Sequence, residues 1–403
     1  MEVNKELRKN VDDVISRVVQ DIDPYNKTKQ CLSSLNFNNG RKILVSIGKA
    51  SWTMAKAVSD SLNIDYGAVI TKYNHSKGEI KNIKVFEAGH PIVDENSIIA
   101  SEYVLDITKD LNENDNVIFC VSGGGSALFE KPLISLVELQ DINNQLIKSG
   151  ADINEINTIR KRLSMIKGGR FALHCNGAHI YTIILSDVIG NDLSAIASGP
   201  TAIDKTTSED ALKIINKYHI DISKESEVLL QEDLPQNIEN VEYHVIGSVE
   251  QLCDYTKNAL ENLNYKTEII QNNCKDNVEN IALRLSRLID CSNHKCAYII
   301  GGESSVEVKG KGLGGRNSEL ALLCSKYIDG LNNVSVFTFG SDGTDGPTDA
   351  AGGYVDGATY SQINVEEYLQ DNDSYNGLKK TGGLIITGPT GSNINDVYVL
   401  LID

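Results

Sequence analysis

Short apolar runs that end in glycine or a polar residue alternate with helical patterns along most of this chain. The runs "KILVSIG", "YGAVIT", "KVFEAG", "NVIFCVSGGG" and "YTIILSD" are typical of short buried strands. Between them lie stretches such as "DENSIIASEYVLDITKDL", whose apolar residues recur three and four positions apart. This alternation predicts α/β layers built on a mostly parallel sheet.

The chain is long enough for two domains. Its 403 residues exceed what one ordinary hydrophobic core organises. The polar stretch "QEDLPQNIEN" (231–240) follows a helical region, and the alternation then begins again with "EYHVIGSVEQLCDYTKNAL". We therefore predict a boundary near residue 238, with one domain over 1–238 and another over 239–403. In open α/β sheets ligands bind at the carboxyl ends of strands, so we expect the functional residues at these ends.

Charge and composition exclude several classes of protein. A formal net charge of −17 argues against a uniformly basic face for nucleic acid. No apolar run approaches the roughly 20 residues of a membrane span. The eight cysteines show no framework spacing, and "MEVNKELRKN" has no signal-peptide character. Composition thus predicts a cytoplasmic protein with reduced thiols and without nucleic-acid or membrane partners; a monomer and a homodimer are both compatible with it.

Two glycine-containing turns follow predicted strands in the first domain. In "KILVSIGKAS", Gly48 and Lys49 stand between a strand and a helix, where a lysine can reach a phosphate, although a solvated surface lysine is the alternative. The P-loop pattern fails, because Ile43 takes its first glycine position and Ala50 its hydroxyl position. The glycines of "SGGGSA" (122–127) let backbone N–H groups approach an anion; the alternative is a plain turn.

The segment "INTIRKRLSMIKGGRFA" (156–172) concentrates positive charge and contains no acidic residue. Its isoleucines and leucine step three and four positions apart, which predicts one buried helix face. The cations occupy the remaining positions: Arg160, Lys161, Arg162, Lys167 and Arg170. Two interpretations stay open, a solvated helix face or an unneutralised cluster that attracts an anionic substrate.

A further glycine pattern lies in the second domain. In "EVKGKGLGGRNSEL", Gly310, Gly312 and Gly315 satisfy the G-x-G-x-x-G pattern of dinucleotide-binding folds. No acidic residue follows at a strand end about 20 positions later, so the match is weak. Arg316, directly after the glycines, suits a phosphoryl group or a carboxylate.

Acidic residues also follow predicted strands. Asp187 ends "YTIILSD", and Asp342, Asp345 and Asp349 lie in "GSDGTDGPTD". A carboxylate at a strand end can hold Mg²⁺ beside a nucleotide, although Asp-Gly pairs also form ordinary turns. Glycine loops, clustered cations and strand-end carboxylates together fit phosphoryl transfer, in which positioning and cations stabilise the charge of the transferred group.

These motifs occur in the order typical of one family. The segments are "SIGKAS", "GHPIVDENS", "CVSGGGSALFEKP", "INTIRKRLSMIKGGR", "LSDVIGNDLSAIASGPT", "GGESSVEVKGKGLGGRNSELAL", "GSDGTDGPTDAAGG" and "TGPTGSNINDV". The chain thereby resembles the glycerate 2-kinases of the MOFRL-containing type, which are not P-loop kinases. The resemblance implies a larger Rossmann-like N-terminal domain, a smaller C-terminal MOFRL domain and an active site in the cleft between them. It also implies transfer of phosphate from ATP, with Mg²⁺, to D-glycerate, giving 2-phosphoglycerate and ADP.

The resemblance also implies roles for individual residues. Lys49 matches the lysine that acts at the transferred phosphate, and Arg316 matches its partner arginine. Residues expected to bind substrate or phosphate are Ser122, Gly123, Gly124, Gly125, Ser126, Arg160, Lys167, Asn191, Glu303 and Asn317. Residues expected to bind the nucleotide are Gly312, Gly314, Gly315, Asp342, Gly343 and Asp345. Asp187 and Asp342 are the candidate Mg²⁺ ligands, and Asp187 is also the candidate base for the glycerate hydroxyl.

Two other functions compete with the kinase. The glycine pattern Gly310–Gly315 would serve an NAD(P)-dependent hydroxypyruvate reductase, which binding of NADH would reveal. The same anion loops would also serve a non-catalytic sensor of a small phosphorylated acid, from which release of ADP in the presence of glycerate would distinguish a kinase.

Overall fold

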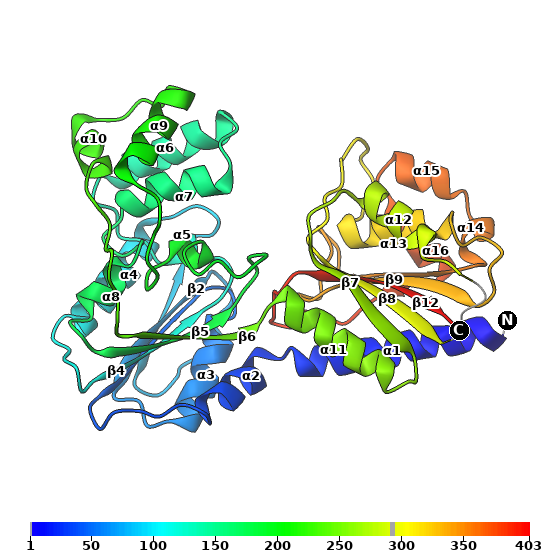
Figure 1. Ribbon diagram of the computed structural model, residues 1–403, viewed down its shortest axis with the longest axis horizontal. Helices are drawn as coiled ribbons and strands as arrows, with labels where there is room; N and C mark the ends of the chain where they lie inside the picture. The colour runs from blue at the N-terminus through cyan, green and yellow to red at the C-terminus, as the bar shows by residue number, and fades with distance from the viewer. Residues whose placement is uncertain (1, 291–294) are drawn as a thin grey trace. The chain divides into compact units, whose positions relative to one another are not determined.

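The computed structural model describes residues 2–290 and 295–403. It has the predicted α/β architecture, with two six-stranded sheets (Figure 1). Chain contacts divide it into two compact units, Pro24–Ile246 and the residues before Pro24 together with those from Gly247 onward. Each unit is described by itself.

The first unit is built on a sheet with the strand order β3-β2-β1-β4-β5-β6. The strands are β1 (Lys42–Ile47), β2 (Tyr66–Lys72), β3 (Ile83–Ala88), β4 (Asn116–Val121), β5 (His179–Leu185) and β6 (Val241–Gly247). The pairs β3–β2, β2–β1, β1–β4 and β4–β5 are parallel, with Leu44 opposite Gly67 and Ile118. The sheet grows in one direction from β1 to β3 and in the other from β4 onward. The loops after β1 and β4 therefore flank a topological switch point, where open α/β sheets form their ligand crevice.

Helices cover this sheet and form a separate layer. They are α2 (Pro24–Leu32), α3 (Ser51–Ser61), α4 (Glu95–Thr108), α5 (Gly125–Leu128), α6 (Leu136–Lys148), α7 (Ile153–Arg162), α8 (Arg170–His174), α9 (Ser208–Tyr218), α10 (Lys224–Leu230) and the 3₁₀ turn η1 (Ile196–Ser198). Asp94 and Asp152 start α4 and α7 with capping boxes, which satisfy N–H groups of the first turn. Helices α6, α7, α9 and α10 gather around a small apolar core of their own (Figure 1).

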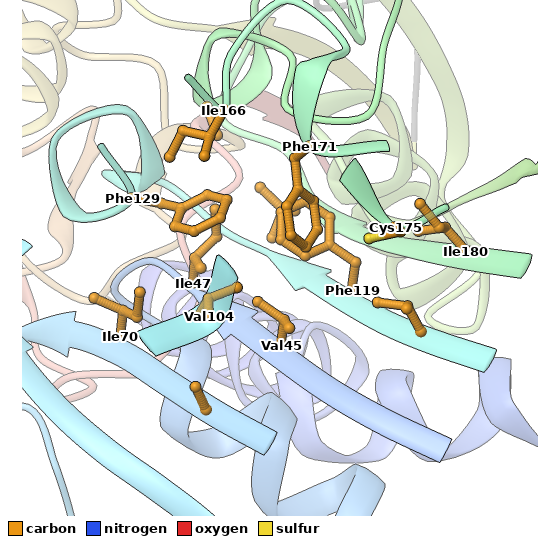
Figure 2. Packing of buried hydrophobic residues seen from close by; sticks show 14 of the residues in the cluster. Val45, Ile47, Ile70, Val104, Phe119, Phe129, Ile166, Phe171, Cys175 and Ile180 are labelled. Atoms are coloured by element: carbon orange, nitrogen blue, oxygen red, sulfur yellow. The ribbon is translucent and has the colours of Figure 1, made fainter. Parts of the chain in front are cut away.

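The main core of this unit lies on the β1–β4 face. Phe119 of β4 packs with Phe129 and Phe171, their ring centroids 5.2 to 6.0 Å apart (Figure 2). Val45 and Ile70 from the neighbouring strands complete the buried surface. Strands that are buried on both faces carry continuous apolar runs, which is why "KILVSI" and "NVIFCV" show no polar alternation.

The second unit contains a mixed sheet with the order β11-β10-β9-β12-β8-β7. The strands are β7 (Lys266–Cys274), β8 (Cys296–Gly302), β9 (Val334–Gly340), β10 (Gly352–Asp356), β11 (Leu384–Ile385) and β12 (Asp396–Ile402). Only β7–β8 is parallel among the described pairs of this sheet. The predicted parallel sheet is thus found in the first unit, whereas the sheet of this unit is mixed, because the last strand inserts antiparallel between β8 and β9.

The helices of the second unit include the first helix of the chain. They are α1 (Glu2–Asp21), α11 (Val249–Glu261), α12 (Val278–Arg287), α13 (Arg316–Ser325), α14 (Thr359–Gln362), α15 (Val365–Gln370) and α16 (Ser374–Thr381). Leu7, Val11, Val14 and Val18 form the buried stripe of α1, which packs on α11 (Figure 1). The division thus differs from the predicted boundary near 238, because α1 joins the second unit and β6 joins the first sheet.

Candidate functional site

Lys49 lies at the topological switch point of the first sheet, in the turn between β1 and α3. Its backbone N–H donates to the carbonyl oxygen of Gly123 at 2.9 Å. The next N–H, of Ala50, donates to Oγ of Ser122 at 3.0 Å. These bonds fasten the turn after β1 to the glycine loop after β4, so Lys49 and the "SGGGS" loop form one local structure.

The lysine side chain carries an unneutralised charge. Lys49 is partly exposed and has no salt bridge with any acid in residues 2–290 or 295–403. The N–H groups of Gly123 and Gly124 likewise have no hydrogen-bond partner among the residues described. An anion can bind where an unpaired cation lies beside two unpaired N–H donors, as Lys49 does here.

Further basic side chains surround Lys49 that sequence reasoning missed. Burial and the charges of Lys49 and Lys72 lower the pKa of His90. Burial and the charge of Lys72 likewise lower the pKa of His75. Lys72 ends β2, and His90 follows β3 by two residues. In the sequence, the available signal for Lys72 and His90 was their position at the carboxyl ends of strands, in "VITK" and "GHPIVDENS".

The two serines of the loop have structural partners. Ser122 is buried; its hydroxyl accepts the Ala50 N–H and donates to the Ile47 carbonyl oxygen at 3.2 Å. The hydroxyl of Ser126 lies 3.0 Å from that of Ser198, which donates to Asn157 Oδ1. The predicted use of the Ser122 hydroxyl as an anion donor does not agree with these bonds, because they occupy it within the loop.

The cation-rich segment holds the loop in place instead of presenting free charge. Lys167 is fully buried; its Nζ donates to the carbonyl oxygens of Ser126 at 2.8 Å and Phe129 at 2.9 Å and lies 3.4 Å from Glu130 Oε2. Arg160 also donates to the Ser126 carbonyl oxygen, at 3.0 Å. The Lys167 side chain therefore positions the loop, and its predicted contact with substrate stays a prediction, whereas Arg160 keeps a partly exposed side chain.

The other cations of this segment pair with acids from elsewhere. Lys161 lies 3.1 Å and Arg162 lies 3.7 Å from carboxylate oxygens of Asp204, and Arg170 lies 3.5 Å from Glu232. Four of the five cations are thus paired with acids, whereas Arg160 has no acid partner among the described residues. The acids of these pairs lie in other parts of the chain, where local charge counting does not find them.

Replacement of Lys167 by methionine should destabilise the protein strongly. Glu130 is fully buried, so loss of Lys167 leaves a buried carboxylate without its cation. We expect Lys167→Met to lower the free energy of unfolding by about 3–5 kcal/mol in urea denaturation. The double variant Lys167→Met/Glu130→Gln should recover part of this loss. A single variant within about 1 kcal/mol of wild type would contradict the buried ion pair.

Asp187 and Asn191 lie past the end of β5. Asp187 is partly buried and stands two residues beyond the strand. Asn191 has a left-handed backbone (φ 51°), and its N–H donates to the Val188 carbonyl oxygen at 3.0 Å. Their predicted roles as Mg²⁺ ligand, base and substrate contact stay predictions.

The glycine pattern of the second unit docks one loop against another. A Cβ on Gly310 would lie 2.2 Å from the carbonyl oxygen of Asp371, and one on Gly312 would lie 2.4 Å from Cβ of Asp373. Side chains of the 371–373 segment accept the N–H groups of residues 309, 310, 311 and 313. These N–H groups are thus not available to a pyrophosphate, which argues against the dinucleotide interpretation and against phosphate contacts by Gly312.

A carboxylate occupies the N-terminus of α13. Asp345 is buried and accepts the N–H groups of Asn317 at 2.9 Å and Ser318 at 2.7 Å. A Cβ on Gly315 would lie 2.4 Å from the same carboxylate, and one on Gly314 would lie 2.2 Å from Ser374 Oγ. Asp345 therefore takes the place that a phosphate would have, which argues against the nucleotide contacts predicted for Gly314, Gly315 and Asp345; these contacts stay predictions.

Arg316 is fixed by two carboxylates. Its Nε donates to Asp396 Oδ2 at 2.7 Å and its Nη1 to Glu303 Oε1 at 2.8 Å. Burial lowers the pKa of Arg316, but the charges of Asp396 and Glu303 outweigh this effect and raise it. Glu303 is half exposed and Asp396 is buried, so an incoming phosphate would compete with Glu303 for the guanidinium.

The remaining candidates lie around a cavity of about 590 Å³ in the second unit. Its lining includes Arg316, Asn317, Glu319 and Asp342, with the exposed Val308 at its edge. Asn317 is nearly fully buried, whereas the partly exposed Asp342 accepts the Thr344 N–H at 3.0 Å. Gly343 has φ +82°, and its Cβ would lie 2.1 Å from a carbonyl oxygen, so it serves the turn. The described residues contain no group of three or more His, Cys, Asp or Glu placed to hold a metal ion.

Glu319 should make stability depend on pH. Burial is the main cause that raises its pKa from 4.5 to about 7, and Glu279 and Asp345 add to it. The folded protein therefore favours the protonated acid, and this contribution to stability is lost as pH rises from 4.5 through 7. We expect Glu319→Gln to stabilise the protein by on the order of 2–3 kcal/mol at pH 8 and little at pH 4.5, measured by thermal unfolding. Equal effects at both pH values would contradict the shift.

No helix within the described part of the chain has both the length and the apolar character needed to cross a membrane.

Comparisons with known proteins cover both units. The family described as "Domain of unknown function (DUF4147)" matches residues 10–231, and the MOFRL family matches residues 296–396. A protein named putative hydroxypyruvate reductase from Agrobacterium vitis is 34% identical over 90% of this chain and 100% of its own. A protein named D-glycerate 2-kinase from Thermotoga maritima is 44% identical over 98% of both chains.

The fold agrees with these relatives. The crystal structure of a glycerate kinase from Thermotoga maritima superimposes with a TM-score of 0.95 at 44% identity, covering 99% of this chain and 100% of that one. The family resemblance inferred from the sequence is thereby confirmed. The chain belongs to the family that joins a DUF4147 domain to a MOFRL domain, the family of the glycerate 2-kinases.

Proposed function

We propose that this protein phosphorylates D-glycerate at the 2-hydroxyl with ATP, releasing ADP. The observation that carries the proposal is the unneutralised Lys49 beside the free N–H groups of Gly123 and Gly124. These groups lie at the topological switch point of the first sheet, whereas four of the five cations of the 156–172 segment are paired with acids. A relative that aligns over 98% of both chains is named D-glycerate 2-kinase, and this name points to D-glycerate as the phosphoryl acceptor.

Some residues of the first unit bind the reacting groups, and others hold those residues in place. Lys49 and the two glycine N–H groups bind the transferred phosphoryl group, whose charge spreads over its oxygens during transfer. Arg160, which already bonds the loop carbonyl of Ser126, binds the glycerate carboxylate. Lys167 holds the glycine loop in place through its hydrogen bonds to the carbonyl oxygens of Ser126 and Phe129.

In the second unit, Arg316 is proposed to bind phosphate oxygens after exchanging its contact with Glu303. Mg²⁺ in kinases is held by one or two carboxylates and the phosphates of the nucleotide. The partly exposed Asp342 fits such a donor set, since its backbone partner leaves one carboxylate oxygen open. Asp187 is the corresponding carboxylate of the first unit. When bound with ATP, the ion would neutralise phosphate charge.

The reductase alternative finds no support in the glycine pattern, because those N–H groups bond the 371–373 segment. Purified protein should therefore not change NADH fluorescence.

One coupled assay tests the proposal. Protein, ATP, Mg²⁺ and D-glycerate are mixed, ADP is measured, and enolase detects 2-phosphoglycerate, since it does not accept the 3-isomer. We expect both signals. ADP without an enolase signal would move the phosphate to the 3-hydroxyl, and absence of ADP would overturn the kinase assignment and favour a sensor.

A further inference from the structure

His90 projects to the point where the Lys49 side chain and the glycine loop meet. A Cβ built on Gly124 would lie 3.0 Å from His90 Nε2, 2.9 Å from its Cδ2 and 3.5 Å from Lys49 Cγ. The imidazole and the lysine therefore converge above the same loop residue. The Gly124 backbone has φ +88°, which turns its bare face toward them. Any side chain at this position would fill the space between the two groups.

The imidazole of His90 is not held by hydrogen bonds to the described residues around it. His90 is partly exposed, and neither ring nitrogen has a hydrogen-bond partner in the described residues. No carboxylate pairs with it there either; its charged and titratable neighbours are Lys49, Lys72 and His75. By contrast, His174 bonds the Leu105 carbonyl oxygen, and His179 and His244 both lie beside Glu242. A histidine held beside a cation without a partner is available to a ligand.

We propose that His90 is the general base for the reaction, a role that rests on the proposed kinase function and replaces Asp187 as the candidate. The lone pair of one ring nitrogen takes the proton of the glycerate 2-hydroxyl. The hydroxyl oxygen bonds to the γ-phosphorus of ATP as the bond from that phosphorus to the β,γ-bridging oxygen breaks. The bonding electrons leave with ADP, and the imidazolium returns its proton to water.

The surroundings keep this base in its working form. Neighbouring cations and burial disfavour the imidazolium and hold the pKa of His90 below its usual range. The neutral ring that can accept a proton thus prevails at pH 7, while Lys49 next to it stabilises the developing negative charge. A base placed within reach of the substrate hydroxyl typically contributes about 10²–10⁴-fold to the rate.

The test compares His90→Gln with His219→Gln, which changes an exposed histidine at the end of α9. We expect His90→Gln to lower kcat by about 10²-fold or more, with the KM for glycerate changed only a few-fold. Wild-type kcat should fall at acidic pH, with the midpoint of this limb below the ordinary histidine value of about 6.5, and the limb should disappear in His90→Gln. His219→Gln should keep both the rate and the acid limb.

Either of two results would overturn the assignment: a kcat within about threefold of wild type, or a reduced kcat that keeps the wild-type acid limb. The second result would make His90 a support of the loop. Should His90→Gln fail to fold, His90→Ala with added imidazole replaces it; recovery of the rate supports the base, and no recovery in a folded variant overturns it. A wild-type protein without enolase signal would instead overturn the kinase function itself.

Discussion

Replacement of Lys49 by methionine is expected to lower kcat for phosphorylation of D-glycerate by about 10²–10³-fold, with little change in thermal stability. The side chain contributes a positive charge that no acid among the described residues neutralises. Its removal therefore leaves no buried carboxylate unpaired, in contrast to the loss of Lys167. The charge is needed most when phosphoryl oxygens leave the nucleotide, so the loss should appear in kcat more than in KM.

A matched control lies on the helix that follows the turn containing Lys49. Lys56 of α3 forms an exposed pair with Asp60, and Lys56→Met should change kcat by less than about twofold, since such pairs contribute little. Steady-state kinetics of both variants, with circular dichroism to verify folding, provide the comparison. A folded Lys49→Met variant with the rate of the Lys56 control would remove Lys49 from the mechanism.

The sequence pattern predicts the first unit well because its central strands are buried on both faces. Continuous apolar runs such as "NVIFCV" define β4 and its neighbours, and each run ends where a functional loop begins. The strand order is not visible in such runs, since each buried strand resembles the others. The strand directions of the mixed second sheet could not be predicted for the same reason: "DVYVLLI" indicates a strand but not its antiparallel insertion between β8 and β9.

Charge was the least predictable part of the site. Lys49, an isolated cation in the sequence, is unneutralised in the fold, whereas four of the five cations in the segment around Lys167 are paired. The reason is separation along the chain: Glu130 precedes Lys167, and Asp204 follows Lys161 by 43 residues. Pairing between such distant groups depends on tertiary contacts, so local composition does not reveal which cation stays free for a ligand.

Glycine spacing was ambiguous for a different reason. Gly310, Gly312 and Gly315 are required by close approach, as in a dinucleotide site, but the approaching partner is the 371–373 segment and Asp345. A protein carboxylate and a phosphate both require backbone N–H groups that they can approach closely. The pattern therefore identifies an N–H-rich turn without identifying its occupant.

Substitution of Gly48 by alanine is the second large effect that we expect. Gly48 has φ +110°, and an added Cβ would lie 2.3 Å from Ser122 Oγ and 2.4 Å from the Ser122 carbonyl oxygen. Since backbone cannot move aside as a flexible side chain does, the turn after β1 must separate from the loop after β4. We expect a loss of at least ~3 kcal/mol in the free energy of unfolding, measured in urea. The rate should fall by about 10²-fold through displacement of Lys49.

Gly78 separates the two causes of this effect. Its φ of +116° nearly equals that of Gly48, but no atom lies within 4 Å of its added Cβ. Gly78→Ala therefore carries the backbone strain alone and should cost about 1–2 kcal/mol with an unchanged rate. If the two variants lose equal stability, the clash with Ser122 is unimportant and the fastening of the two loops is not what holds Lys49. If Gly48→Ala loses more stability and also loses activity, close contact between these loops places the lysine.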